Sequence, residues 1–180
     1  MVPNILLGVA VVLLILFAVL YVVVSRQPAE FRIERTGSFA APPERVFAQI
    51  NDLHNWKAWS PWAKLDPNAT ETHEGAPAGV GAIMSWNGNK KVGAGRMTIL
   101  DSKPHESIRI KLEFLRPMRA TNQSEFTIRS ANGGSTVLWS MTGTNGFMGK
   151  AFCLMVNMDK LVGADFEKGL ANLKAIVEPS

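Results

Sequence analysis

The sequence predicts an α+β domain that follows a single apolar N-terminal helix. Three observations predict it: residues 5–24 form an unbroken apolar run, residues 70–144 show strand patterns separated by turn residues, and residues 149–177 carry apolar side chains at helical steps. Strands in one block with helices at its ends are typical of a curved antiparallel sheet whose apolar face needs cover. We therefore expect one long C-terminal helix as that cover, with a cavity between helix and sheet.

The N-terminal run reads ILLGVAVVLLILFAVLYVVV from residue 5 to residue 24. These uncharged residues would form a helix of about 30 Å, long enough to cross the core of a bilayer. A secretory signal peptide is the alternative, but such peptides usually begin with a basic residue and end at a small-x-small cleavage site. The N-terminal residues MVPN contain no basic side chain, and the segment after the run, VVVSRQPAE, shows no clear cleavage site. We therefore favour a transmembrane anchor over residues 1–25 and a linker over 26–30.

Charge predicts the orientation and excludes one class of partner. Arginines follow the span at positions 26, 32, 35 and 45, so the positive-inside rule places the soluble domain, residues 31–178, on the cytoplasmic side of a single-pass membrane protein. The net charge is +4 with scattered basic residues, and the pair Lys90-Lys91 is the longest basic run. This distribution lacks the footprint of a nucleic-acid-binding protein.

The soluble domain is expected to begin with a strand and a helix. Residues 31–39, FRIERTGSF, alternate apolar with polar side chains, which is typical of a half-buried strand. Pro42-Pro43-Glu44 then opens a helix, because proline is tolerated in a first turn and a carboxylate suits the positive end of the helix dipole. The inward stripe of this helix consists of Val46, Phe47 and Ile50.

The stretch that follows, NDLHNWKAWSPWAKLD over residues 51–66, is unusually rich in tryptophan. Trp56, Trp59 and Trp62 recur every three residues, so they gather on one side of a short helix that Pro61 limits. The rings either seal the apolar core or guard the mouth of a cavity. We favour sealing, because the burial of a tryptophan side chain stabilises a fold by more than ~1 kcal/mol.

About six antiparallel strands are expected between residues 70 and 144. Tight hairpins are expected at Asn87-Gly88, Asn132-Gly133 and Asn145-Gly146, because these pairs supply positive φ angles. The clearest strand covers residues 107–115, where four apolar side chains alternate with charged or polar ones. One face of the sheet is therefore expected to be buried and the other to be exposed to solvent.

The segment 149–177 is expected to be one helix with a core-facing stripe, which consists of Phe152, Met155, Asp159, Val162, Phe166, Leu170, Leu173 and Val177. Gly163 and Gly169 mark either a bend or a close backbone approach. The single cysteine, Cys153, lies in the apolar context AFCLMVNM. We expect it to be a buried small hydrophobe and not a nucleophile.

Two side chains are candidates for acid/base chemistry. Asp159 would have a raised pKa if it pointed into an apolar cavity, and it could then donate a proton or hold a ligand hydroxyl. The alternative is that it turns to solvent, or that it pairs with Lys160 or an arginine of the sheet. His54 is the second candidate.

Inward side chains of the strands and of the last helix are expected to line the ligand cavity, and unbranched methionines would adapt its shape. The candidates are Trp59, Trp62, Met84, Met97, Ile110, Leu112, Phe114, Phe126, Trp139, Met141, Met155, Asp159 and Phe166. Their ordinary role as core residues is the alternative for each of them.

Motifs for metals and cofactors are weak in this sequence. His54, His73 and His105 fall on different expected elements and show no metal-ligand spacing. Gly79-Val80-Gly81 and Gly93-Ala94-Gly95 neither complete a phosphate-binding motif nor lead into a helix. We therefore expect no metal and no cofactor.

Several motifs carry a resemblance to a known family. Ala41-Pro42 leads to Val46-Phe47, Trp59-Ser60-Pro61-Trp62 follows, and TVLWSMTG (136–143) and residues 165–174 complete the set. Over residues 30–178 the chain resembles the polyketide cyclase/dehydratase and lipid-transport branch of the START-like (SRPBCC) superfamily. The resemblance implies a helix-grip fold, in which seven antiparallel strands wrap the C-terminal helix around a hydrophobic cavity. It implies no common catalytic residues.

The leading hypothesis is a membrane-anchored domain that binds a hydrophobic or amphipathic small molecule, such as a lipid, without covalent chemistry. The second is a cyclase/dehydratase-like enzyme with Asp159 or His54 as its acid/base. The third is an interaction module that uses the outer face of the sheet.

Overall fold

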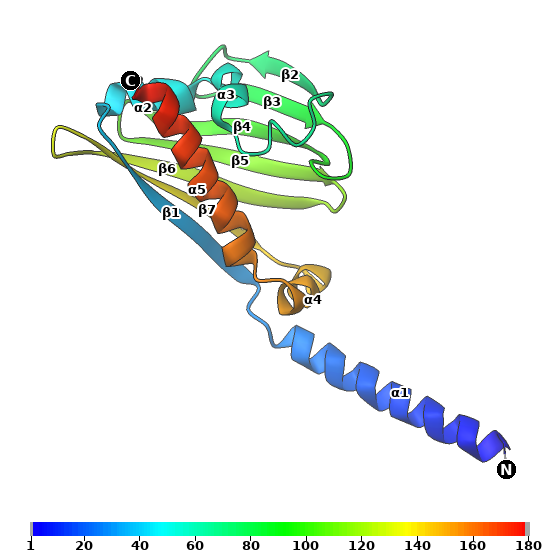
Figure 1. Cartoon of the computed structure of the whole chain (residues 1–180). Helices are drawn as coiled ribbons and strands as arrows, with labels where there is room; N and C mark the ends of the chain where they lie inside the picture. Colours follow the sequence, from blue (N-terminus) through cyan, green and yellow to red (C-terminus); the bar gives the residue numbers. More distant parts are fainter. Residues whose placement is uncertain (1, 179–180) are drawn as a thin grey trace. The chain divides into compact units, whose positions relative to one another are not determined.

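The computed structural model describes residues 2–178, so Met1 of the expected anchor lies outside the described residues (Figure 1). Contacts divide the chain into two compact units. The first contains residues 2–31 and 144–157, and the second contains residues 32–143 and 158–178. Each unit is described by itself below.

The first unit contains helices α1 (Val2–Ser25) and α4 (Phe147–Met155). Among the described residues, one helix is long and apolar enough to cross a bilayer, over Leu6–Ser25 with a mean hydropathy of 3.2. Apolar side chains from Leu6 to Val23 are exposed along it. A helix of this length and composition serves either as a membrane anchor or as a signal sequence.

The second unit is built on a seven-stranded antiparallel sheet with the order β1-β7-β6-β5-β4-β3-β2. Consecutive strands from β2 to β7 pair as neighbours, and β7 returns beside β1. The strands are β1 (Glu30–Phe39), β2 (Thr70–Gly75), β3 (Ala82–Asn87), β4 (Ala94–Lys103), β5 (Ser107–Arg116), β6 (Ala120–Ala131) and β7 (Gly134–Thr144).

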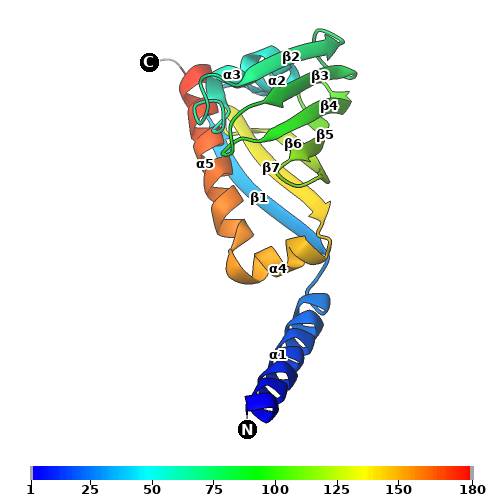
Figure 2. The same ribbon diagram turned by 90° about the vertical axis from the view of Figure 1, so that its right-hand side faces the viewer.

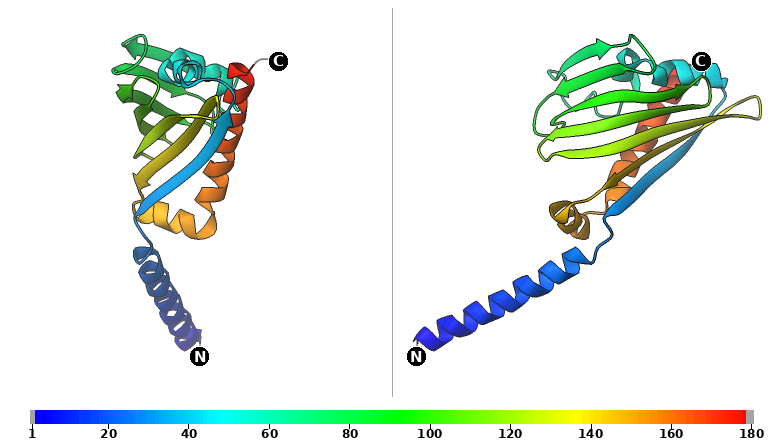
Figure 3. Two further views of the ribbon diagram at one scale, coloured as in Figure 1. Left: turned by 90° about the vertical axis from the view of Figure 1, so that its left-hand side faces the viewer. Right: turned by 180° about the vertical axis from the view of Figure 1, so that it is seen from behind.

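One long helix, α5 (Met158–Val177), lies across the concave face of this sheet (Figure 2). Seen from behind, the strands lie in front of α5, so the outer face of the sheet points away from the helix (Figure 3). The core between them includes Phe126, Trp139, Phe166 and Leu173. This arrangement confirms the predicted helix-grip architecture.

Three short helices connect β1 to β2 near one end of α5: α2 (Pro43–Asn51), η1 (Leu53–Asn55) and α3 (Trp56–Trp59) (Figure 1). As the sequence predicts, α2 begins at Pro43 and buries Val46, Phe47 and Ile50. Helix α3 is only one turn long, so Trp62 lies beyond it in the following turn.

The prediction of one helix over residues 149–177 is wrong. The chain leaves helical geometry at Val156, which has extended φ and ψ angles of −128° and 126° and separates α4 from α5. The stripe holds over the later turns of α5, where Phe166, Leu170, Leu173 and Val177 are buried, but Asp159 in the first turn is exposed. It fails in α4: Phe152, Met155 and Cys153 are exposed there, which also corrects the expectation that Cys153 is buried.

One of the three asparagine-glycine pairs makes the tight hairpin that was predicted. Asn132 and Gly133 both have positive φ and join β6 to β7. The connection from β3 to β4 is longer, and its positive φ lies at Gly93 rather than at Gly88. Gly146 has a φ of −70° because it begins α4 instead of closing a hairpin.

Candidate functional site

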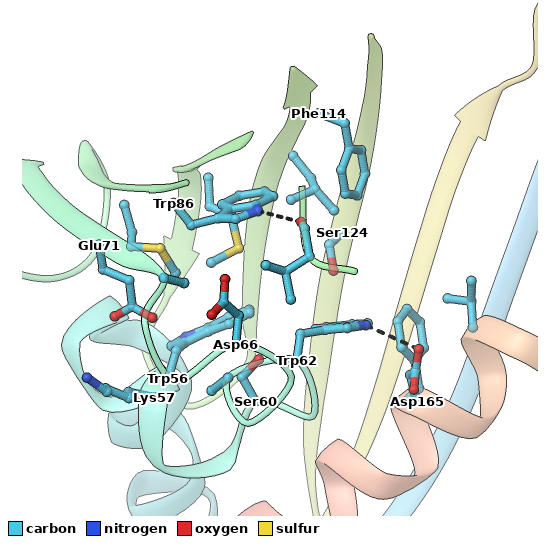
Figure 4. Close-up of a pocket in the computed structure, with 18 of the residues that line it drawn as sticks. Trp56, Lys57, Ser60, Trp62, Asp66, Glu71, Trp86, Phe114, Ser124 and Asp165 are labelled. Atoms are coloured by element: carbon cyan, nitrogen blue, oxygen red, sulfur yellow. Dashed lines mark hydrogen bonds between the residues drawn. The ribbon is translucent and has the colours of Figure 1, made fainter. Parts of the chain in front are cut away.

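A cavity of about 270 Å³ opens between the concave face of the sheet, helix α5 and the segment that carries the tryptophans (Figure 4). Its walls are mostly aromatic and aliphatic. The described lining residues are Trp56, Lys57, Ser60, Trp62, Ala63, Asp66, Ala69, Glu71, Met84, Trp86, Lys91, Val92, Met97, Leu112, Phe114, Ser124, Trp139, Met141, Val162, Asp165 and Phe166.

Stacked and edge-on rings form one side of the cavity. Trp139 of β7 stacks on Phe166 of α5, with ring centroids 4.0 Å apart and planes only 6° from parallel. The edge of Trp62 meets Trp139 at 5.9 Å and 86°. Rings in these two arrangements attract each other beyond their burial alone, so the three side chains form a firm wall.

The indole N–H groups of three lining tryptophans donate to protein acceptors. Trp62 Nε1 donates to Asp165 Oδ2 at 3.1 Å (Figure 4), and Trp139 Nε1 donates to the buried Ser124 Oγ at 2.9 Å. Trp56 Nε1 donates to the Ile50 carbonyl oxygen at 2.9 Å. Because these donors are already paired, the rings present carbon surface to the cavity.

The opposite wall depends on a glycine. Gly95 of β4 pairs with Trp86 of β3, and a Cβ atom at Gly95 would overlap the Trp86 ring and the Glu113 carbonyl oxygen. The missing side chain therefore lets the Trp86 ring lie across β4. Trp86 Nε1 donates to the Val92 carbonyl oxygen at 3.0 Å, which fixes the ring in place.

Charged side chains of both signs stand among the lining residues. Lys57, Lys91 and Glu71 are exposed, and the half-buried Asp66 accepts backbone N–H groups of Asn68 at 3.1 Å and Asn89 at 2.6 Å. Figure 4 shows Lys57 and Glu71 together, away from Asp165 on α5. The cavity thus combines an apolar body with charged groups at separate places.

Eight of the candidate cavity residues lie along this cavity in the structure: Trp62, Met84, Met97, Leu112, Phe114, Trp139, Met141 and Phe166. Trp59, Ile110 and Phe126 are instead fully buried in the core and are not among the described lining residues. Met155 lies on α4 and is 87% exposed, because the helical stripe is broken before α5 begins.

Asp159 lies on the surface, paired with an arginine of the sheet. Arg35 Nη1 and Nη2 donate to its two carboxylate oxygens at 3.0 and 3.2 Å, and Arg35 Nε donates to Glu167 at 2.7 Å. The hydrogen bonds from Arg35 hold the pKa of Asp159 below its usual value. This is the opposite of the raised pKa expected for a cavity acid, and it matches the alternative of pairing with a sheet arginine.

His54 is also absent from the described lining residues. Its side chain is 54% exposed, its Nδ1 atom lies 2.8 Å from Asp52 Oδ1, and its ring stacks on His73 with centroids 4.0 Å apart. No spacing motif in the sequence indicates that His54 and His73 lie together. Among the described residues, no group of three or more His, Cys, Asp or Glu side chains could hold a metal ion.

Several lining residues were missed in the sequence, although simple periodicity indicates some of them. Trp86 is two residues from Met84 and Ser124 is two residues from Phe126, so each shares a strand face with a residue that was proposed. Asp165 follows Val162 by three positions on α5, which places both on one helix face. Trp56 shares the three-residue spacing of Trp59 and Trp62, but that spacing does not indicate which of the three rings reaches the cavity.

Comparisons with known proteins agree with this fold. Residues 30–178 match the sequence profile of the family described as polyketide cyclase / dehydrase and lipid transport. Among curated proteins, no significant sequence match was found.

The solved structures that are similar share little sequence with this chain. Protein CV1439 from Chromobacterium violaceum has a TM-score of 0.60 at 19% identity, over 86% of this chain and 100% of that chain. The Aha1 dimer from Colwellia psychrerythraea has a TM-score of 0.59 at 13% identity, over 83% and 97%. DynU16, from the dynemicin biosynthetic locus, has a TM-score of 0.57 at 15% identity, over 82% of this chain and 47% of that one.

Structural similarity at identities this low establishes the fold alone, so the function has to be inferred from the site. The profile match covers all of the described second unit, and the seven-stranded sheet with its C-terminal helix has the same architecture as the solved structures. This chain therefore belongs to the polyketide cyclase / dehydrase and lipid transport family and has the START-like helix-grip fold.

Proposed function

We propose that this protein is a membrane-anchored binding domain for a hydrophobic or amphipathic small molecule, held without covalent chemistry in the cavity between sheet and α5. The observation that most supports this is the cavity of about 270 Å³ with aromatic and methionine walls. Concave, mostly apolar sites with a few polar groups are the usual form of small-molecule sites.

The chemistry of the walls favours a ligand with a substantial apolar body. Trp62, Trp86 and Trp139 offer flat carbon surfaces, while Met84, Met97 and Met141 adapt to irregular shapes. The charged side chains around the cavity would suit a polar head group, and Asp165 would accept a hydrogen bond from a ligand hydroxyl or amine. Lipids and other amphipathic molecules combine these two features.

The anchor part of the proposal rests on the apolar run of α1. Its twenty-residue window contains no charge and its side chains are exposed, as expected for a helix whose surroundings are lipid. The arginines after the span favour a cytoplasmic second unit. Alkaline extraction of membranes that carry the full chain tests the anchor, and protease protection of sealed vesicles tests the side.

Ligand binding is tested by native mass spectrometry of the full chain, released from a mild detergent and offered a panel of lipids and apolar probes. Val162 faces the cavity, whereas its neighbour Leu161 is exposed to solvent. Val162→Trp should fill the cavity and abolish uptake, while Leu161→Trp should bind as the original chain does. Failure of the original chain to retain any probe, or equal uptake by both variants, would contradict the proposal.

An enzyme with acid/base chemistry is the second candidate, and one observation favours it. Asp165, unlike Asp159 and His54, lines the cavity and is hydrogen-bonded to Trp62. A proton transfer to a bound ligand would therefore depend on Asp165. Incubation with polyketide-like chains tests this: Asp165→Asn should abolish turnover while binding is retained, and product formation without Asp165 would exclude it.

A further inference from the structure

Helix α4 exposes an apolar face that a water-soluble helix would bury. None of its nine residues, FMGKAFCLM, is buried. Met148 is 67% exposed, Phe152 46% and Met155 87%. Their spacing of four and three residues places these three side chains on one face of the helix.

Helix α4 packs beside the last turn of the apolar helix α1. The Tyr21 and Phe147 rings stack with centroids 5.2 Å apart, and Lys150 Nζ donates to the Ser25 carbonyl oxygen at 3.4 Å. The backbone N–H of Asn145 donates to the Ala29 carbonyl oxygen at 2.7 Å. Helix α4 is therefore held at the level where the apolar run of α1 ends.

The contact with Lys150 also explains the orientation of α4. Lys150 lies on the opposite side of the helix from the apolar face, since it is two positions, about 200° around the helix, from both Met148 and Phe152. Its ammonium group interacts with the C-terminal end of α1, where a positive charge is favourable. The two contacts fix the side of α4 that carries Phe147 and Lys150 on α1 and leave Met148, Phe152 and Met155 outward.

We propose that α4 lies in the head-group layer of the same bilayer that α1 spans, with Met148, Phe152 and Met155 inserted toward the acyl chains. Helices with one apolar face bind in this layer, where aromatic side chains are also enriched. The inference rests on the anchor part of the proposed function. A lipid surface fits better than a protein partner, because α4 is attached to the end of a membrane-spanning helix.

The test uses the full chain in vesicles of phosphatidylcholine and phosphatidylglycerol. In a Cys153→Ser background, a polarity-sensitive fluorophore is attached to Met155→Cys, to Met148→Cys, or to Ser130→Cys as a control on the exposed end of β6. Lipids with a nitroxide quencher just below the head group are then added. The labels at 155 and 148 should lose most of their emission, and the label at 130 should keep it.

Alkaline extraction of the same vesicles separates the two proposals. A chain that resists extraction but shows no quenching at 155 and 148 would overturn the α4 inference and leave the anchor intact. A blue-shifted but unquenched label would mean that a second copy covers α4, which also overturns it. A chain released by alkali would overturn the anchor, and the α4 inference with it.

Discussion

The guanidinium group of Arg35 on β1 donates two hydrogen bonds, of 3.0 and 3.2 Å, to the carboxylate of Asp159 at the start of α5. Arg35 Nη2 also donates to the Asp159 carbonyl oxygen at 2.9 Å. Gly163, one turn further on, leaves room for this group, since a Cβ atom there would overlap the guanidinium. The pair ties an edge strand to the helix that the sheet wraps, so its role is structural.

The first prediction concerns the stability of this pair at acid pH. Since Arg35 holds the pKa of Asp159 below its unfolded value, the ionised carboxylate stabilises the fold above an unfolded pKa of about 3.9. That contribution is lost as the pH falls through the lower, folded pKa. Asp159→Asn should therefore lower the melting temperature at pH 7 and have little effect at the acid end.

Thermal unfolding of the full chain in detergent between pH 7 and pH 2.5 measures this difference. Glu106→Gln, which changes an exposed carboxylate in the turn between β4 and β5, is the control and should show no such pH-dependent difference. A destabilisation by Asp159→Asn that is the same at every pH would show that the charge of Asp159 is irrelevant.

The second prediction separates two tryptophans that the sequence presents alike. Trp59 is fully buried, whereas Trp62 is partly exposed and lines the cavity. Trp59→Ala should destabilise the fold by about 3–5 kcal/mol because it leaves a large void. Trp62→Ala should cost less, about 1–2 kcal/mol, and should weaken ligand binding.

Chemical denaturation and probe binding, measured on both variants, check this assignment. Equal losses of stability would mean that Trp62 belongs to the core as firmly as Trp59. Undiminished binding by the folded Trp62→Ala variant would mean that the ligand lies elsewhere.

The fold was predictable because its signals are periodic and repeated. The stripe of Phe166, Leu170, Leu173 and Val177 recurs over three turns, and the period of two along β5 leaves little choice of face. The break at Val156 was not predictable, because Met155-Val156-Asn157-Met158 contains neither glycine nor proline. That hidden break moved Met155 out of the stripe.

The site was less predictable because it depends on contacts between distant segments. Which of the tryptophans reaches the cavity depends on where the single turn of α3 ends, at Ser60 with ψ of 129°. Asp165 becomes a cavity residue through its hydrogen bond with Trp62, more than a hundred positions earlier in the chain. Spacing within one element carries no information on such pairs.

The third prediction concerns Gly169 on α5, which is packed against Trp139. A Cβ atom at Gly169 would lie 2.7 Å from the Trp139 ring and 3.2 Å from Pro61 Cδ. Gly169→Ala gains about 1 kcal/mol of helix propensity, but crowding of a packed core costs more, so a net loss of about 1–2 kcal/mol is expected. Displacement of Trp139 should also weaken binding in the cavity.

Ala171→Gly, at an exposed position of the same helix, is the matched control. It should cost about 1 kcal/mol through propensity alone and leave ligand binding unchanged. If Gly169→Ala proved more stable than the original chain, this would contradict the close packing of α5 against Trp139.

The fourth prediction concerns the hydrogen bond between Trp62 and Asp165. Asp165→Asn keeps an acceptor oxygen for Trp62 Nε1, whereas Asp165→Leu removes it and leaves a partly buried N–H unpaired. Asp165→Leu should therefore lose about 1–3 kcal/mol of stability. Asp165→Asn should stay close to the original chain in stability and in Trp62 emission.

For cationic amphiphiles, however, Asp165→Asn should bind less tightly than the original chain, because the negative charge is gone, while neutral probes bind as before. A loss of affinity for neutral probes as large as that for cationic ones would contradict a role for the charge of Asp165 in ligand binding.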